Sequence, residues 1–332
     1  MNKPIILLTS LALWTPLSAV QSLESTYRTA GPAVHGAFDD VQPFLQTGSA
    51  VFQKGRDEII FGTVISPDGF ILTKASELGD LDGVSVTVDR ERYDNPVLVA
   101  QDHAWDVALV KIEAEGLIPV DIAGDDIEQG TWVVANGATS RSKRRVQVGI
   151  VAANVREVYA KGGTVLGVAL KADTEEIVVD EVTEGTGAEA AGLMSGDKIV
   201  SFEGEEITDR ESLMEKLEKR RVGDEVQIGI ERDGKKITLP VELAGRADVF
   251  GEEKTRNDAM SGEFSERRTG FPKVMQTDVM GNRRFMGGPV LDLDGRCVGM
   301  NIARYSRCET YAIPGRELKE LAGQMMESAK TR

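Results

Sequence analysis

The stretch that decides the fold lies toward the C-terminal end of the chain. Residues 278–314 read DVMGNRRFMGGPVLDLDGRCVGMNIARYSRCETYAIP. Two glycines and a proline interrupt it at 287–289, and an apolar run starting at Val290 follows. Further on, Val298–Ile302 and Glu309–Ile313 have the composition of two paired strands. The stretch therefore predicts a glycine-rich loop that leads into a β-hairpin.

Two cysteines, Cys297 and Cys308, flank this hairpin. In an exported chain a disulfide between them would persist. A turn centred on Arg304–Ser306 does not place them directly opposite each other, and disulfide geometry is specific. The sequence therefore does not decide whether the two cysteines are bridged. Metal binding has little support, because only two histidines, His35 and His103, could join these thiols. We expect neither a metal nor a cofactor.

Upstream of the decisive stretch, short β-branched runs are separated by turn residues. Residues 49–53, 59–65 and 70–73 read as strands, with Pro67-Asp68-Gly69 as the turn between the last two. Strands at this spacing favour a barrel or a sandwich.

Length and charge exclude several classes of function. A chain of 332 residues can hold two ordinary domains, and 41% apolar residues exclude general disorder. The formal charge of -15 opposes binding to nucleic acids and to anionic membrane surfaces, which need basic patches. We therefore expect no nucleic-acid partner.

The N-terminus has the pattern of a secretory signal peptide over residues 1–22. A lysine at position 3 precedes the apolar run Ile5–Trp14, and small residues follow at Ser18, Ala19 and Ser22. The run is too short for a membrane-spanning helix, and an uncleaved anchor is the alternative. After cleavage we expect no membrane span and a location in the periplasm or cell envelope, with an extracellular location left open. Residues 23–47 read as a linker.

Three segments resemble the trypsin-like serine proteases of the Deg/HtrA family. Met286-Gly287-Gly288-Pro289 resembles the family's nucleophile loop G-N-S-G-G-P, while residues 61–78 and 101–112 resemble the segments that carry the catalytic histidine and aspartate. The resemblance implies a mainly β fold, a double six-stranded β-barrel. The first barrel would span residues 48–122, and the second 123–159 together with 246–328.

The same resemblance places the catalytic triad on Ser76, Asp106 and Met286, of which only Asp106 matches the family. Attack on a peptide bond needs a nucleophile and a base, and neither a thioether nor a serine hydroxyl replaces them. Arg284 stands where the family has a glycine that serves the oxyanion hole, and Phe285 with Met286 reads as a hydrophobic plug. Three rescue routes remain as alternatives: His103 as base, Lys74 paired with Ser76, and Cys297 as nucleophile.

Residues 160–245 resemble a bacterial PDZ domain, inserted within the second barrel rather than following it as in the family. The resemblance assigns the loop Val165, Leu166, Gly167 and Val168 to capture of a peptide carboxylate. An amphipathic helix near Asp209–Arg221 supplies Leu213 and Leu217 as candidates for a side-chain pocket, unless they serve only the core. The segment has 11 basic and 20 acidic residues, a net charge of -9, so acidic peptides should be poor ligands.

These features predict an exported, protease-like protein without catalytic activity that binds peptides or protein C-termini as a scaffold or regulator. An active serine endopeptidase with an atypical site is the alternative. Active Deg/HtrA relatives and further copies of this chain are also candidate partners. The polar stretch 245–270 reads as a connector or mobile loop.

Overall fold

The computed structural model describes residues 24–27, 31–137, 144–172, 174, 176–251, 256, 260 and 262–330. The signal peptide expected over residues 1–22 lies outside this part of the chain. The chain divides into two units, Met1–Ala37 and Phe38–Arg332. The first unit contains the short helices η1 (Ser25–Tyr27) and α1 (Pro32–Gly36).

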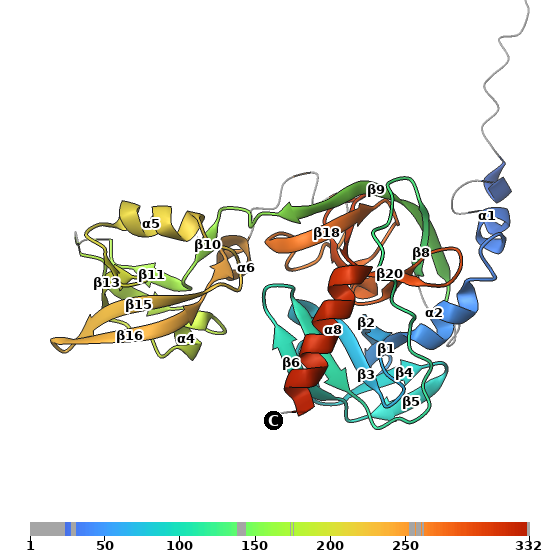
Figure 1. Ribbon diagram of the computed structural model, residues 1–332, viewed down its shortest axis with the longest axis horizontal. Helices are drawn as coiled ribbons and strands as arrows, with labels where there is room; N and C mark the ends of the chain where they lie inside the picture. The colour runs from blue at the N-terminus through green and yellow to red at the C-terminus, as the bar shows by residue number, and fades with distance from the viewer. Residues whose placement is uncertain are drawn as a thin grey trace, which may run out of the picture. The chain divides into compact units, whose positions relative to one another are not determined.

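The first half of the larger unit is one antiparallel sheet of seven strands (Figure 1). Its hairpin β2–β3 has the predicted turn, in which Gly69 has φ +98°. A Cβ at this position would lie 2.3 Å from the Ile112 carbonyl oxygen, so only glycine fits. The order across the sheet is β5 (Glu91–Asp94), β4 (Val84–Val88), β1 (Ser49–Lys54), β2 (Asp57–Val64), β3 (Phe70–Lys74), β7 (Val107–Lys111) and β6 (Val97–Asp102), with helix α3 (Ala75–Leu78) after β3.

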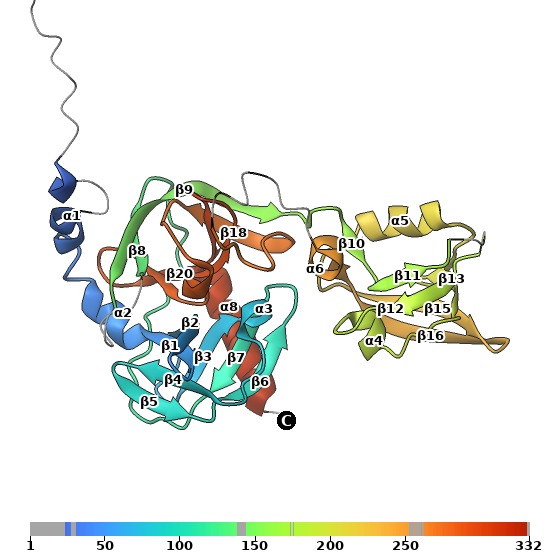
Figure 2. The same ribbon diagram turned by 180° about the vertical axis from the view of Figure 1, so that it is seen from behind.

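The second half is a closed six-stranded barrel whose strands come from two separate parts of the sequence. Two strands are made before the insertion and four after it, and β9 and β18 meet side by side in Figures 1 and 2. The order around the barrel is β18 (Phe271–Thr277), β21 (Thr310–Pro314), β20 (Cys297–Arg304), β19 (Pro289–Leu291), β8 (Trp132–Asn136) and β9 (Val146–Val158).

The chain between β9 and β18 forms three small sheets and short helices with a core of their own. Helix α5 (Arg210–Glu218) begins after Asp209, whose carboxylate accepts a hydrogen bond from the Ser212 amide at 2.8 Å. The elements are β10 (Thr164–Val165) with β17 (Ala244–Gly245), β11 (Val168–Leu170) with β12 (Val179–Val182), the sheet β14 (Glu205–Glu206), β13 (Lys198–Phe202), β15 (Glu225–Arg232) and β16 (Lys235–Glu242), and helices α4 (Gly187–Ala190) and α6 (Arg246–Phe250).

The C-terminal helix α8 (Gly315–Lys330) closes the larger unit (Figure 1). It packs on β6, β20 and β21 through residues at helical spacing: Leu318, Leu321, Ala322 and Met325 are all buried in the main core. Strand β20 is therefore covered on both faces, and only its last residue, Arg304, is partly exposed.

The segment before β1 differs from the linker that the sequence suggests. Residues Gln42–Gly48 form helix α2, and Leu45 is fully buried in the main core together with Val41. These two apolar side chains are four residues apart and so share one face of a helical turn.

The two cysteines are free thiols, so the disulfide that the sequence left undecided is absent from the structure. Cys297 is buried at the start of β20, whereas Cys308 is exposed in the turn beyond its other end. A strand of eight residues extends about 24 Å at about 3.4 Å per residue. Because bridged Cα atoms lie within about 7 Å, the pair cannot form an intramolecular disulfide.

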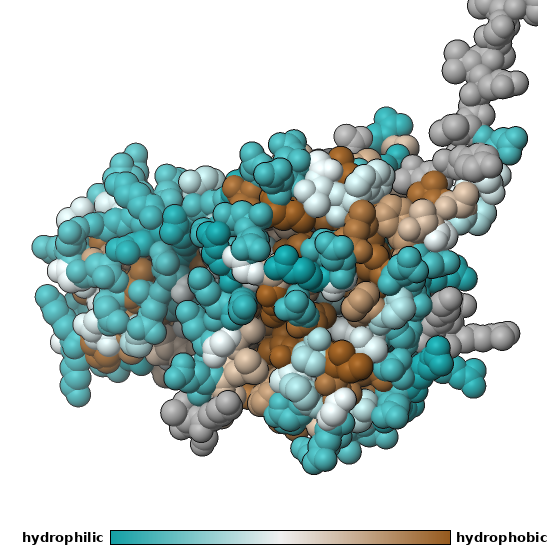
Figure 3. All heavy atoms as spheres, turned by 45° about the vertical axis from the view of Figure 1, so that its right-hand side comes forward, coloured by the Kyte–Doolittle hydropathy of each residue, from teal (hydrophilic) through white to brown (hydrophobic). Residues whose placement is uncertain are grey.

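The surface of the larger unit is mixed. On the face in Figure 3, hydrophilic residues dominate the part on the left, while hydrophobic residues gather on the rest. Exposed apolar side chains include Phe44, Val97, Ile118, Trp132 and Leu293. Within the described residues, no helix has the length and apolar character needed to cross a membrane.

Candidate active site and peptide groove

In the loop expected to carry the nucleophile, backbone amides donate hydrogen bonds to acceptors within the same loop. Residues Arg283–Phe285 form the 3-10 turn η2, and Asn282 Oδ1 accepts a hydrogen bond from the Arg284 amide at 3.1 Å. The Met286 amide donates to the Arg283 carbonyl at 3.2 Å. In chymotrypsin-type sites the amides of the nucleophile and of the residue two before it form the oxyanion hole. Both corresponding amides here already have acceptors inside their loop.

The Met286 side chain is fully buried within the core of the first sheet. Phe285 packs beside it, with its ring 5.6 Å from that of Phe61 at 88°. A Cβ at the next residue, Gly287, would lie 2.2 Å from the Phe61 carbonyl oxygen, so the loop is pressed against β2. Met286 and Phe285 therefore both pack into the protein at this loop, as a plug would require.

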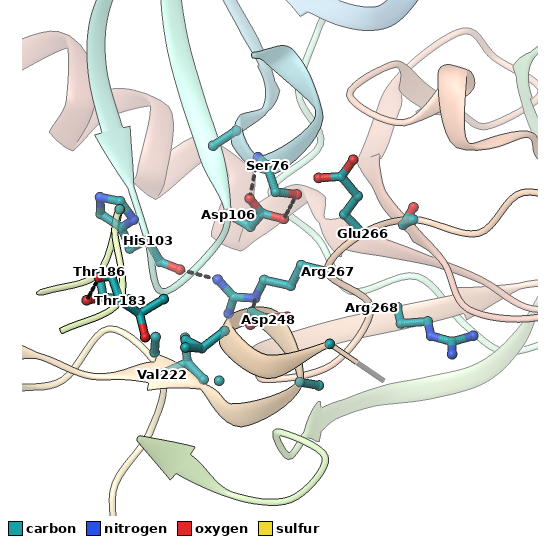
Figure 4. Close-up of a pocket in the computed structure, with 18 of the residues that line it drawn as sticks. Ser76, His103, Asp106, Thr183, Thr186, Val222, Asp248, Glu266, Arg267 and Arg268 are labelled. Atoms are coloured by element: carbon teal, nitrogen blue, oxygen red, sulfur yellow. Dashed lines mark hydrogen bonds and ion pairs between the residues drawn. The ribbon is translucent and has the colours of Figure 1, made fainter. Parts of the chain in front are cut away.

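Ser76 and Asp106 meet, although their sequence positions are 30 residues apart. The Asp106 carboxylate accepts a hydrogen bond from the Ser76 amide at 2.8 Å and one from the Ser76 hydroxyl at 2.9 Å (Figure 4). Asp106 is buried, with φ +57°, and Ser76 is exposed. The structure thus brings together the two positions that the resemblance assigns to the base and the orienting carboxylate, and the residue at the first is a serine, which supplies no base.

Lys74 provides the charge that pairs with Asp106. Its ammonium group is fully buried and donates hydrogen bonds to the Asp106 carboxylate and, at 2.9 Å, to the Arg267 carbonyl. A buried carboxylate without such a partner would be costly. In these contacts Lys74 acts as a donor, so the structure does not support its use as the base of a Ser-Lys pair.

The other rescue routes fare no better. His103 is exposed at the end of the loop before Asp106, and the hydrogen bonds of the Asp106 carboxylate go to Ser76 and Lys74 instead. Burial raises the pKa of the Cys297 thiol to about 12, and its Sγ lies 3.1 Å from the Gly299 carbonyl oxygen. A thiol with this pKa forms almost no thiolate at neutral pH.

A second buried carboxylate, Glu77, ties the nucleophile loop down. Arg283 Nε lies 3.2 Å from Glu77 Oε2, and the Glu266 amide donates to Glu77 Oε1, also at 3.2 Å. Desolvation by burial raises the pKa of Glu77, although the charges of Lys74 and Arg283 act in the opposite direction. Arg283 also pairs with the Glu266 carboxylate at 3.2 Å.

An open cavity of about 1230 Å³ lies in front of these residues (Figure 4). Ser76 and Asp106 line it on one side, and Thr183, Thr186 and Glu242 line it on the other. Met286 is not among the lining residues, which agrees with its burial. The cavity thus reaches the position of the base but not that of the nucleophile.

The predicted carboxylate loop stands at the start of a free strand edge. Gly167 has φ +89° and faces Thr186 so closely that a Cβ would lie 2.5 Å from the threonine side chain. In the part of the chain that the structure describes, the amides of Leu166 and Gly167 donate no hydrogen bond. Strand β11, which follows, pairs only with β12 among the described strands.

Helix α5 lies beside β11, as Figure 2 shows. At the start of α5, Arg210 donates to the carbonyl of Lys171, the residue after β11. Near the end of α5, the Leu217 carbonyl accepts a hydrogen bond at 2.5 Å from the hydroxyl of Thr164 in β10, the strand before β11. Leu213 and Leu217 are buried in the core with Leu166. Met214 on α5 is 39% exposed, and Val168 and Leu170 on β11 are partly exposed, so part of each of these apolar side chains is accessible.

Sequence reasoning missed the parts played by Glu77 and Arg267 and assigned Lys74 only a rescue role. The one local signal was the run Lys74–Glu77, which places three polar side chains directly after an apolar strand. Within the described residues, no cluster of three or more histidine, cysteine, aspartate or glutamate side chains could hold a metal ion.

Comparison with family models defines the class of protein. Residues 61–195 match the trypsin-like peptidase domain, and residues 164–243 match the PDZ domain. The two matches overlap at 164–195, a stretch that the structure builds into the inserted elements from β10 to α4. The chain therefore carries a trypsin-like peptidase domain and a PDZ domain, and the predicted fold class is confirmed.

The relatives are DegP-like proteins. The chain is 26% identical over 286 residues to the "Probable periplasmic serine endoprotease DegP-like" of Marinomonas sp. (strain MWYL1), a match that covers 62% of this chain and 61% of that protein. It is 24% identical over 358 residues to the protein of the same name from Pseudomonas fulva (strain 12-X), covering 84% and 73%. A crystal structure of the serine endoprotease from Yersinia pestis is 17% identical with a TM-score of 0.34, covering 62% of this chain and 97% of that one.

Proposed function

We propose that this chain is an exported, catalytically inactive relative of the DegP-like proteases that binds the C-termini of polypeptides through its PDZ domain. It acts as a scaffold or regulator, either as copies of itself or together with an active relative. Export to the periplasm is supported by the pattern of residues 1–22 and by the names of the relatives.

The observation that carries the binding proposal is the pair of amides at Leu166 and Gly167. They have no acceptor in the described part of the chain, and the positive φ of Gly167 turns the loop at the start of β11. Successive backbone amides in a turn form a concave site for anions. A peptide that adds to the free edge of β11 would bring its terminal carboxylate to this loop.

The proposal of inactivity is supported at each step that proteolysis requires. Met286 has no ionisable atom and is fully buried, and Ser76 replaces the base. The amides of Met286 and Arg284 donate within their own loop. In subtilisin, loss of the serine or the histidine alone lowers kcat by about a millionfold.

A library of C-terminal decapeptides tests the binding proposal. The best binder is synthesised again with a free carboxylate and with a terminal amide, and both are titrated by fluorescence anisotropy. We expect affinity for the acid and at least tenfold weaker binding of the amide, because the amide carries no charge for the loop. Equal affinities of the two forms would exclude carboxylate capture.

A further inference from the structure

The segment Glu263–Thr269, here called the strap, lies across the former active site instead of forming a loose connector. Its side chains alternate in burial: Ser265, Arg267 and Thr269 are 4%, 7% and 7% exposed, while Glu266 is exposed and Arg268 partly exposed. This period of two is that of an extended chain lying on a surface. Three buried polar residues in a polar connector require partners.

The first anchor of the strap is the open edge of β20. Strand β19 pairs with β20 from Cys297 to Met300, and beyond that point β19 no longer covers this edge. The Ser265 amide donates to the Arg304 carbonyl at 3.3 Å, and the Arg304 amide donates to the Ser265 hydroxyl at 2.9 Å. One backbone–backbone hydrogen bond and one bond to the serine hydroxyl thus attach the strap to the end of β20.

The next two residues reach the elements that carry the triad positions. The Glu266 amide donates to Glu77 in α3, next to Ser76, and its carboxylate pairs with Arg283, three residues before Met286. The Arg267 carbonyl accepts a hydrogen bond from Lys74, the partner of Asp106. Consecutive strap residues therefore contact the neighbours of all three triad positions, as Figure 4 shows for Glu266 and Arg267 beside Ser76 and Asp106.

The Arg267 side chain fixes the end of the strap. Its guanidinium group donates to the carbonyls of His103 and Ala104, in the loop just before Asp106, the second at 3.0 Å. It also lies 4.9 Å from the centre of the Phe271 ring, within range of a cation-π interaction. These contacts match a planar group with several donors and would not be reproduced by lysine.

We propose that the strap is an intramolecular ligand of the former substrate groove, which binds an extended peptide with the order serine, acidic residue, arginine. A substrate must cross the positions of base and nucleophile to be cut, and the strap is held by residues next to both, along the wall of the cavity that Ser76 and Asp106 also line. The groove is therefore a second peptide site, separate from the PDZ domain and filled by this chain itself.

Hydrogen exchange on the wild-type full-length protein is the first test, because it needs no variant. We expect the amides of Ser265 and Glu266 to exchange at least a hundredfold more slowly than in an unstructured peptide, since both donate to protein acceptors. Exchange at the unstructured rate would overturn the proposal.

The second test replaces residues 263–268 by glycine and serine at the same length and adds a labelled synthetic peptide of residues 262–270. We expect this variant to bind the peptide at least tenfold more tightly than the wild type, whose groove is filled. A control peptide with Glu266→Lys and Arg267→Glu should not bind. A cooperative thermal unfolding transition like that of the wild type shows that the variant is folded, and this readout does not depend on the PDZ proposal. A folded variant that ignores both peptides, or binds them equally, would overturn the proposal.

Discussion

The Lys74 ammonium and the Asp106 carboxylate form an ion pair inside the protein, with side chains 0% and 5% exposed. In an active triad the aspartate orients a histidine. Here the histidine position holds Ser76, and a lysine two residues earlier neutralises the aspartate. The ion pair thus gives Asp106 a structural role in the folded protein.

Removal of one partner should therefore cost far more than removal of both. We expect Lys74→Met to destabilise the protein by about 3–5 kcal/mol, because it leaves a buried carboxylate unpaired. The double variant Lys74→Met with Asp106→Asn should recover a large part of this loss. Urea unfolding of Lys74→Met, Asp106→Asn and the double variant measures the coupling energy between the two side chains. Additive losses would contradict the structural role of the pair.

The burial of Met286 predicts a loss of stability when its side chain is shortened. Met286→Ala should lower the free energy of unfolding by about 2–5 kcal/mol, since it opens a cavity in the core. Met280, in the same loop region but 68% exposed, provides the matched control. Met280→Ala should change stability by less than about 0.5 kcal/mol. Similar small effects at both positions would mean that Met286 is not a plug.

Glu77 predicts a specific pH dependence of stability. Its pKa is raised above the ordinary value of 4.5 in the folded protein, so the folded state holds the proton more tightly than the unfolded state. The contribution of Glu77 is most favourable at low pH and declines as the pH rises through the raised pKa. Glu77→Gln removes this titration.

Unfolding of both proteins between about pH 4 and pH 7 checks this sign. The stability of the wild type relative to Glu77→Gln should fall steadily as the pH increases. A constant difference would show that the ion pairs of Glu77 cancel the cost of burial, and a difference that grows in favour of the wild type would show that they outweigh it; either result contradicts the raised pKa.

Even a change to alanine at Gly167 should weaken peptide binding. The added methyl group would meet Thr186 at 2.5 Å and deform the loop that carries the two amides. Gly204→Ala is the control, because Gly204 also has positive φ (+79°) but no atom within 4 Å of the added Cβ. We expect Gly167→Ala to weaken binding of the C-terminal peptide at least tenfold. Gly204→Ala should leave the affinity within about twofold, at a cost of about 1 kcal/mol in stability. Equal effects would argue against the loop.

The sequence predicted the features that depend on local patterns. The turn at Pro67-Asp68-Gly69 and a helix beginning near Asp209 follow from local residue types, and the structure adds the cap that Asp209 provides. Ser76 and Asp106, which the resemblance assigns to one site, are brought together because β3 pairs with β7.

Contacts between distant segments could not be read from the sequence. Ser265 and Arg304 are 39 residues apart, and Glu266 and Glu77 are 189 apart. The stretch 245–270 is polar, which normally indicates a solvated loop, and the burial of Ser265, Arg267 and Thr269 within it depends on partners that the fold supplies. The single apolar spacing of Val41 and Leu45 was likewise too short a signal to predict helix α2.

The most direct test of the account is intact-mass analysis of unfolded casein incubated with purified wild-type protein. The sample is compared with the same protein carrying Gly167→Ala, which does not alter the former active site. We predict that casein keeps its full mass with both proteins, because the nucleophile, the base and the amides for the oxyanion are absent or occupied. Casein-cleaving activity that stays with the wild-type chain through successive columns would contradict the account.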